Sequence, residues 1–230
     1  MSKPFAWSYS ALTQAELCPK RFAALRVFKT YKEPEGEAML YGNRVHKSLE
    51  NRVRVGLPLP EDLKHLEPTV VKLMSLGESK AEEKYGLDSN LRLTEYFDKP
   101  TTKPDHRVWL RIVIDLQIFL PGGATALLVD WKTGKEKEDL DQLKLFAGVM
   151  FALYPQLQQV RTGYCWTSEN KIAPTPFTRA EVPAIWKSFM PRVTWLQNMY
   201  ETNGWQARPS GICVKHCPVV ECPFHGKGNR

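Results

Sequence analysis

The feature that most constrains the fold is an alternating stretch, RVWLRIVIDLQIFL, at residues 107–120. Every second residue from Val108 to Leu120 is apolar, a spacing that places these side chains on one face of a β-strand. Asp115 falls on the opposite face. A glycine pair that favours a turn follows, and ALLVDWK at 126–132 is the next apolar stretch. The sequence therefore predicts a β-hairpin made of these two strands.

The period of the apolar residues predicts helices on both sides of this hairpin. Ser10 is expected to cap the first of them, at 10–28, and Pro19 to interrupt it. Further helices are predicted at 37–56, 61–76, 138–155 and 179–201, and further strands near 158–167 and 171–177. This order of elements indicates an α+β or α/β core.

Composition narrows the class of protein further. The chain has 230 residues, 43% of them hydrophobic, and a net charge of +7. These values suit a globular domain and favour a polyanionic partner without requiring one. No run of about 18 apolar residues is present, so no membrane span is expected. The first ten residues lack the apolar segment of a signal peptide, and the expected location is the cytoplasm.

A charged triplet ends the second strand of the hairpin. In LLVDWKTGK, Asp130 and Lys132 are two residues apart and therefore point to the same face. The hairpin can bring Asp115 beside them. Carboxylates bind Mg²⁺ or Mn²⁺, and an ammonium group neutralises charge that develops on phosphate, so this set suits a metal-dependent nuclease. A solvated strand end is the alternative, because such triplets are common.

Cysteines form a second group of candidate ligands. Three of the five, Cys213, Cys217 and Cys222, lie within ten residues near the C-terminus. In a cytoplasmic protein this spacing indicates metal binding more readily than disulfides. Reduced cysteines without a metal are the alternative. Cys165 falls inside an apolar strand pattern and is expected to be a small buried side chain.

IVIDLQIF followed by LLVDWKTGK resembles the PD-(D/E)xK nuclease superfamily. The resemblance is greatest to its RecB-like branch, which includes the RecB and AddB nuclease domains and the CRISPR adaptation exonuclease. It implies an α/β, restriction-endonuclease-like core in which helices flank a central mixed β-sheet. It also implies catalytic roles for Asp115, Asp130 and Lys132, with both aspartates as metal ligands. Trp131 replaces the usual tyrosine, and its backbone carbonyl would be a further metal ligand.

Two predicted helices carry further matches to this branch. YGNRVHKSLE resembles its G-x-x-x-H helix, which implies that His46 is a metal ligand. DLDQLKLFAGVM resembles its Q-x-x-x-Y motif, which implies that Gln142 orients DNA or the catalytic site. Phe146 replaces the tyrosine, so the hydroxyl is lost or supplied from elsewhere. Glu82 and Glu83 fall where many relatives carry a glutamate on an early strand, and a solvated charge run is an equal alternative.

The cysteines match the same branch. SYSALTQAELCPKRFAAL resembles its N-terminal C-P-x-x-F segment, and the C-terminal cysteines resemble its three-cysteine cluster. The resemblance implies that four thiolates bind one 4Fe–4S cluster that joins the N- and C-terminal segments. These are Cys18, Cys213, Cys217 and Cys222. The spacing C-x3-C-x4-C departs from the C-x2-C-x5-C of the best-known relatives, which leaves Zn²⁺ as the alternative metal.

The resemblance extends from about Ser8 to Cys222 and implies a single PD-(D/E)xK nuclease domain over 1–230. Residues 1–36 would form an N-terminal helical segment that carries the first cysteine. Residues 204–230 would form a Cys-rich tail. The N- and C-terminal segments are thus expected to meet at a metal or iron–sulfur centre outside the sheet.

The implied activity is hydrolysis of DNA by an exonuclease that depends on Mg²⁺ or Mn²⁺. The expected substrate is single-stranded DNA or DNA with free ends, and a single-strand-binding or recombination protein is an expected partner. Size and the lack of a helicase motif point to phage or mobile-element recombination, repair or DNA processing, in the host cytoplasm if phage-encoded. The alternative is a catalytically inactive DNA-binding or recombination-partner module with the same metal-joined fold.

Overall fold

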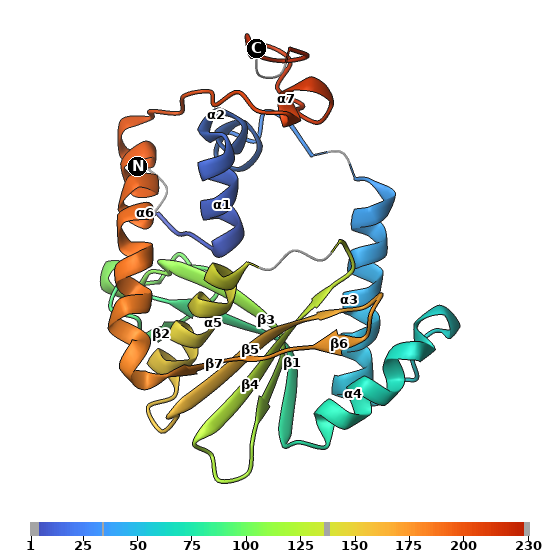
Figure 1. Ribbon diagram of the computed structural model, residues 1–230. Coiled ribbons are helices and arrows are strands. Elements are labelled where there is room, and N and C mark those ends of the chain that lie inside the picture. Colours follow the sequence, from blue (N-terminus) through green and yellow to red (C-terminus); the bar gives the residue numbers. More distant parts are fainter. Residues whose placement is uncertain (1–4, 34, 136–138, 228–230) are drawn as a thin grey trace. The chain divides into compact units, whose positions relative to one another are not determined.

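The computed structural model describes residues 5–33, 35–135 and 139–227. The chain divides into two compact units. The larger comprises residues 36–187 and holds the sheet; the smaller comprises residues 1–35 and 188–230. Figure 1 colours both by sequence. The single domain expected over the whole chain stays a prediction.

The larger unit contains most of the regular structure. Its helices are α3 (Glu37–Val55), η2 (Glu61–Leu66), α4 (Glu67–Met74), η3 (Pro104–His106), α5 (Leu140–Leu153) and η4 (Arg179–Glu181). Its strands are β1 (Glu78–Leu87), β2 (Leu93–Thr94), β3 (Leu110–Phe119), β4 (Thr125–Lys132), β5 (Gln159–Trp166), β6 (Lys171–Ile172) and β7 (Thr175–Thr178). The smaller unit contains α1 (Tyr9–Leu17), α2 (Pro19–Phe22), the π-helical η1 (Ala23–Val27) and α7 (Ile212–Lys215). Helix α6 (Val182–Thr202) begins in the larger unit and ends in the smaller.

The strands form one mixed sheet. Among the described residues it has seven strands, in the order β2-β1-β3-β4-β5-β6, with β7 paired to β5. β3 and β4 are the predicted antiparallel hairpin, with Leu116 opposite Val129. β4 and β5 are parallel, with Asp130 beside Tyr164, and α5 makes the long connection that a parallel pair requires. An α/β fold with a mixed central sheet flanked by helices is confirmed.

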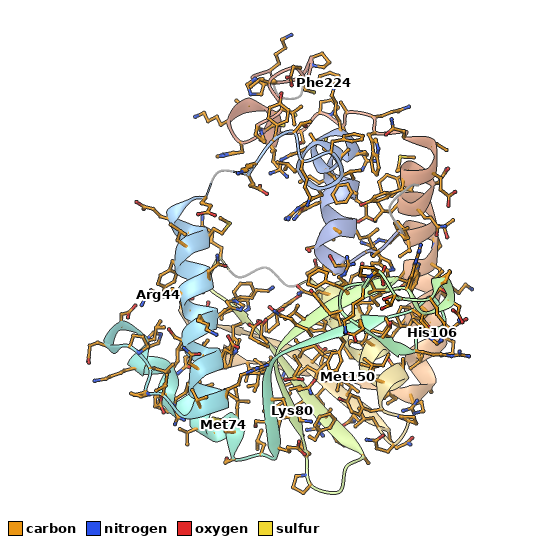
Figure 2. The ribbon with its side chains drawn as sticks, turned by 180° about the vertical axis from the view of Figure 1, so that it is seen from behind. Arg44, Met74, Lys80, His106, Met150 and Phe224 are labelled. Carbon is orange, nitrogen blue, oxygen red and sulfur yellow. The ribbon has the colours of Figure 1, made fainter. Side chains whose placement is uncertain are left out.

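Helices α3 and α4 cover one face of the sheet. Val45 and Leu49 of α3 are fully buried in a cluster with the apolar face of β3 and β4. Met74, at the end of α4 and labelled in Figure 2, packs against the same cluster. Arg44, also labelled, is ion-paired with Asp62 of η2. The four-residue spacing seen in the sequence therefore marks the buried side of α3.

Helix α5 lies on the opposite face. Its middle is almost entirely apolar, and Phe146 and Met150 are buried. Because side chains alternate along a strand, Asp115 and Asp130 point away from the α3 cluster and share the α5 face. Gln142 in the first turn of α5 contacts Asp130 across this face. The crossover helix thus brings a polar side chain to the end of β4.

Strands β1 and β2 were not predicted from the sequence. The β1 segment, ESKAEEKYGL, has no alternation of apolar residues, and only four of its ten residues are buried. It is a strand because it pairs along its length with the strongly alternating β3, from Glu78–Phe119 to Leu87–Leu110. Pairing with a neighbour overrides a weak local preference for the strand conformation.

The smaller unit joins segments from both ends of the chain. The Lys20 amide donates to the Gln206 carbonyl oxygen at 3.1 Å. Trp7 is buried beside Phe189, with ring centroids 6.2 Å apart. The predicted cap of the first helix was wrong by two residues, because Ser8 accepts the Ala11 amide at 3.2 Å.

In the part of the chain that the structure describes, no helix combines the length and the apolarity needed to cross a membrane.

Candidate active site

Three side chains from three elements meet beside α3, at the groove that this helix lines. His46 of α3 has its Nδ1 3.4 Å from Asp115 Oδ2 of β3 and 3.6 Å from Glu82 Oε1 of β1. One ligand atom of each residue lies within 4.8 Å of the other two. Within residues 5–33, 35–135 and 139–227, no other group of three His, Cys, Asp or Glu side chains is this close. One imidazole and two carboxylates suit a shared divalent cation.

Glu82 joins this group through an irregular backbone. Its φ angle is 50°, in the left-handed region that residues other than glycine rarely adopt. The pairing of β1 with β3 passes from Ala81–Leu116 to Glu83–Ile114, without a bridge between Glu82 and Asp115. The two carboxylates therefore project from the point where the ladder is interrupted. Such strained residues concentrate at functional sites.

Asp130 and Lys132 form an adjoining pair at the end of β4. Lys132 Nζ is 2.6 Å from Asp130 Oδ2, and Gln142 Nε2 donates to Asp130 Oδ1 at 2.9 Å. Lys132 Nζ also donates to Gln142 Oε1 at 3.4 Å. Asp130 lies outside the His46 group: its Oδ1 accepts from Gln142, and its buried Oδ2 has the Lys132 ion pair as its contact. The predicted residues thus fall into two neighbouring sets.

Tyr164 of β5 supplies a hydroxyl at this site. Its hydroxyl lies 2.7 Å from the Asp139 carbonyl oxygen and 3.2 Å from Gln142 Oε1, the two acceptors of its single hydrogen. The Lys132 ammonium lies 5.0 Å from the centre of its ring. Phe146, where the motif has its tyrosine, is buried in the core. Sequence reasoning missed Tyr164. The signal that could have found it is the apolar strand GYCW, which follows the D-x-K strand after one helix, as a parallel neighbouring strand does.

Backbone contacts fix the two aspartates relative to each other. The Trp131 amide donates to Asp115 Oδ2 at 2.8 Å, while its indole is buried in the α3 cluster. This alternation explains why Trp131 can replace a tyrosine, because the side chain points away from the site. The metal-binding role of its carbonyl stays a prediction.

Electrostatics at His46 reflect its two acidic neighbours. Burial alone would lower the pKa of His46, but the hydrogen bonds that its ring donates to the Asp115 and Glu82 carboxylates outweigh it and raise the pKa to about 10. The imidazole is therefore protonated at neutral pH when no cation is present. A divalent cation at this position would take the place of that proton.

Whereas His46 favours its charged form, the pKa of Asp130 is shifted toward its neutral form. Burial, followed by repulsion from Asp115, raises the pKa of Asp130 to about 7, against the attraction of Lys132. The ionised form of Asp130 is thus disfavoured chiefly because burial removes it from solvent.

An open groove leads to the His46 group. It has a volume of about 480 Å³ and runs along α3, with Gly42, His46, Lys47 and Thr133 among its lining residues. A Cβ at Gly42 would lie 3.3 Å from Thr133 Oγ1. The glycine of the G-x-x-x-H segment therefore keeps α3 close to the end of β4 while leaving the groove open.

The four candidate cysteines lie in the smaller unit. Two accept backbone amides, Cys18 Sγ from Arg208 and Cys213 Sγ from Ser210, both at 3.4 Å. All four are free thiols in this structure. Cys165 is fully buried in the sheet, as predicted, and burial raises its pKa to about 11.

Comparison with known protein families identifies the superfamily of the chain. The family model described as the PD-(D/E)XK nuclease superfamily matches residues 6–222. The chain belongs to the PD-(D/E)XK nuclease superfamily. Asp115, Asp130 and Lys132 all lie inside the match. In this superfamily divalent metals are the usual cofactors, and the His46, Glu82 and Asp115 group offers a place for one.

Solved structures share the fold of this superfamily member. A "Putative exonuclease" from Eubacterium rectale has a TM-score of 0.52 at 12% sequence identity, over 98% of this chain and 89% of that chain. The protein SSO0001 covers the same shares at 12% identity, with a TM-score of 0.48. No curated protein matches this chain in sequence. At these identities the similarity concerns the fold alone, and the RecB-like branch stays a prediction.

Proposed function

We propose that this superfamily member is a metal-dependent DNA exonuclease. The observation that carries the proposal is the convergence of His46, Glu82 and Asp115 beside the Asp130–Lys132 pair. An acidic metal site next to a lysine is the combination that phosphodiester hydrolysis requires. The name of the Eubacterium rectale protein agrees with exonuclease activity.

We infer that His46, Glu82 and Asp115 would hold Mg²⁺ or Mn²⁺, with Asp130 and the Trp131 carbonyl as further candidates. When bound, the cation supplies Lewis acidity toward phosphate and lowers the pKa of a water molecule. Glu82 is an addition to the predicted ligands. Its chemistry fits, because carboxylate oxygens are the ligands that both cations prefer.

Lys132 would stabilise the charge that develops on the scissile phosphate. Its ammonium is held by Asp130 and Gln142, so it is oriented before substrate binds. Gln142 would act on DNA or on the catalytic lysine through the same bonds. Preorganised positive charge of this kind is worth most in a site that excludes water.

The substrate we propose is single-stranded DNA or DNA with free ends, in recombination, repair or DNA processing of a phage or mobile element. The net charge of +7 supports a polyanionic substrate. A single-strand-binding or recombination protein is the proposed partner, and the host cytoplasm the proposed location. A catalytically inactive DNA-binding module remains the second candidate, because the same charge and fold would serve binding alone.

We also propose that Cys18, Cys213, Cys217 and Cys222 hold a 4Fe–4S cluster. Backbone amides directed at two of the sulfurs support thiolate ligands. A tetrahedral Zn²⁺ site would place its sulfurs about 3.8 Å apart. No three of these four sulfurs, all in described residues, lie within 4.8 Å of one another. The cluster is proposed on the resemblance of the cysteine motifs, with Zn²⁺ as the alternative.

The experiment is degradation of end-labelled single- and double-stranded DNA with Mg²⁺, Mn²⁺ or EDTA. Asp115→Asn and Lys132→Met should each lower the rate by at least about 10²-fold. Asp62→Asn, which removes a carboxylate of an exposed ion pair, is the matched control and should cut like wild type. If wild-type protein binds DNA but cuts neither substrate with any metal, the binding-module alternative replaces the nuclease.

A further inference from the structure

One arginine near the end of α3 is bonded to the backbone that carries Glu82. Arg54 Nε donates to the Ala81 carbonyl oxygen at 2.8 Å, and its Nη2 donates to the same oxygen at 2.6 Å. Nη2 also donates to the Glu82 carbonyl oxygen at 3.3 Å. A single guanidinium thus binds two consecutive carbonyl groups at the irregular point of β1.

The backbone at this point needs such support. Glu82 combines a φ of 50° with a side chain that must face His46 and Asp115. In a regular strand the same residue would have a negative φ and a bridge to β3, and here it has neither. A left-handed residue other than glycine persists only where its surroundings hold it in place. Arg54 is a charged side chain that holds this residue on both sides. It is bonded to the Ala81 carbonyl oxygen, which precedes the Glu82 amide, and to the carbonyl oxygen of Glu82 itself.

Two carboxylates hold the arginine in turn. Arg54 Nη2 lies 3.2 Å from Glu83 Oε1, and its Nε lies 3.6 Å from Glu50 Oε1. The other oxygen of Glu50 accepts from Lys47 Nζ at 2.7 Å. Because the guanidinium is planar, these contacts fix the direction of all its N–H groups together. The direction of the two carbonyl groups on β1 is fixed with them.

We propose that Arg54 is a positioning residue for the metal site. By binding the Ala81 and Glu82 carbonyls, it stabilises the left-handed backbone at Glu82 and directs the Glu82 carboxylate toward His46 and Asp115. This inference rests on the metal-dependent function proposed above. Arg54 contacts no proposed ligand atom, and it acts on the site only through the backbone of β1.

Titration calorimetry with Mn²⁺ and no DNA tests the proposal, since it reads metal binding independently of catalysis. Arg54→Met should weaken Mn²⁺ binding by roughly 10-fold, the size expected when a residue that orients a metal ligand is lost. Arg54→Lys, which keeps the charge but loses the fork of donors, should give an intermediate loss. Arg52→Met is the matched control, because Arg52 lies on the same turn of α3 and pairs with Glu67 instead. It should leave the Mn²⁺ affinity within twofold.

A double-mutant cycle separates positioning from a general effect of charge. Glu82→Gln should weaken Mn²⁺ binding, and adding Arg54→Met to it should cause little further loss. Mn²⁺ affinity of Arg54→Met and Arg54→Lys equal to wild type would overturn the proposal. So would full additivity of the Arg54 and Glu82 changes, or wild-type protein that binds no Mn²⁺. Arg54-dependent Mn²⁺ binding by a protein that cuts no DNA would support this inference and overturn the proposed nuclease function instead.

Discussion

The hydroxyl of Tyr164 donates to the side-chain oxygen of Gln142 at 3.2 Å. Gln142 is on α5 and Tyr164 is on β5, the strand that follows it. In the RecB-like motif the tyrosine is expected one turn after the glutamine, where this chain has the buried Phe146. The contact therefore shows a hydroxyl beside Gln142 that comes from a different element.

Removal of that hydroxyl should reduce activity without unfolding the protein. In Tyr164→Phe, Gln142 loses one of the bonds that hold it against Asp130 and Lys132. A hydrogen bond of this kind contributes about 1 kcal/mol, so we expect kcat to fall about fivefold to tenfold. Tyr154→Phe is the control, because its hydroxyl bonds Tyr85 at 3.0 Å instead of the site residues. Equal kcat for Tyr164→Phe and wild type would contradict the role of this contact.

Because His46 loses its proton as the pH rises, the metal-free protein should become less stable at high pH. The pKa of His46 is about 10 in the folded protein and about 6.5 in an unfolded chain. Because the folded state holds the proton more tightly, the stabilisation is complete below about pH 6.5 and is lost on the way to pH 10. With EDTA present, the Tm difference between wild type and His46→Gln should shrink steadily over this range. A Tm difference that grows with pH would contradict a raised pKa of His46.

Cation binding should release a proton for the same reason. A divalent cation cannot share the imidazole nitrogen with hydrogen, so Mn²⁺ affinity should increase from pH 6.5 to 8.5, by up to about tenfold per pH unit. Calorimetry in two buffers with different ionisation enthalpies measures the number of protons released. In His46→Gln the pH dependence should become markedly weaker. An affinity of the wild-type protein that is independent of pH would argue against His46 as a ligand.

Gly77 lies where β1 begins beside the end of β3, and no larger residue fits there. A Cβ on Gly77 would come within 2.0 Å of the Phe119 carbonyl oxygen, which belongs to the backbone and cannot rotate away. Gly77→Ala should therefore lower the free energy of unfolding by about 1–3 kcal/mol. Gly36→Ala, where a Cβ meets nothing within 4 Å, is the control. Urea unfolding should show a lower midpoint at an unchanged m-value for Gly77→Ala alone.

Loss of one thiolate should remove the metal from the smaller unit. Protein purified anaerobically should absorb near 400 nm and contain iron if the cluster assignment is right. Cys213→Ser should lose this absorbance and lower the Tm, since metal binding and folding are coupled. Cys165→Ala should keep it, because Cys165 is buried in the sheet. Colourless protein with bound zinc would favour the zinc alternative, and wild-type protein with neither metal would contradict both.

Much of the larger unit follows from local patterns in the sequence. The alternation of residues 107–120 and the four-residue spacing of α3 set the hairpin and the buried side of the helix. The register of the hairpin, with Leu116 opposite Val129, then places Asp115 and Asp130 on the same face, so two of the predicted site residues share a face from local rules alone. The match of the superfamily model confirms the superfamily that the D-x-K strand predicted.

The tertiary structure decided which residues reach the site from elements that no local pattern in the sequence connects. Glu82 reaches the site because β1, a charged segment without alternation, pairs with β3 and bends at that residue. Tyr164 reaches Gln142 because β5 lies parallel to β4. Arg54 lies 28 residues before the carbonyl of Glu82 that it binds.

The sequence by itself therefore determined most of the helices and strands of the larger unit and the nuclease superfamily. Only the folded chain decided which side chains complete the site. The physical reason is that periodicity reports burial along one element, whereas ligand geometry depends on contacts between elements far apart in the chain.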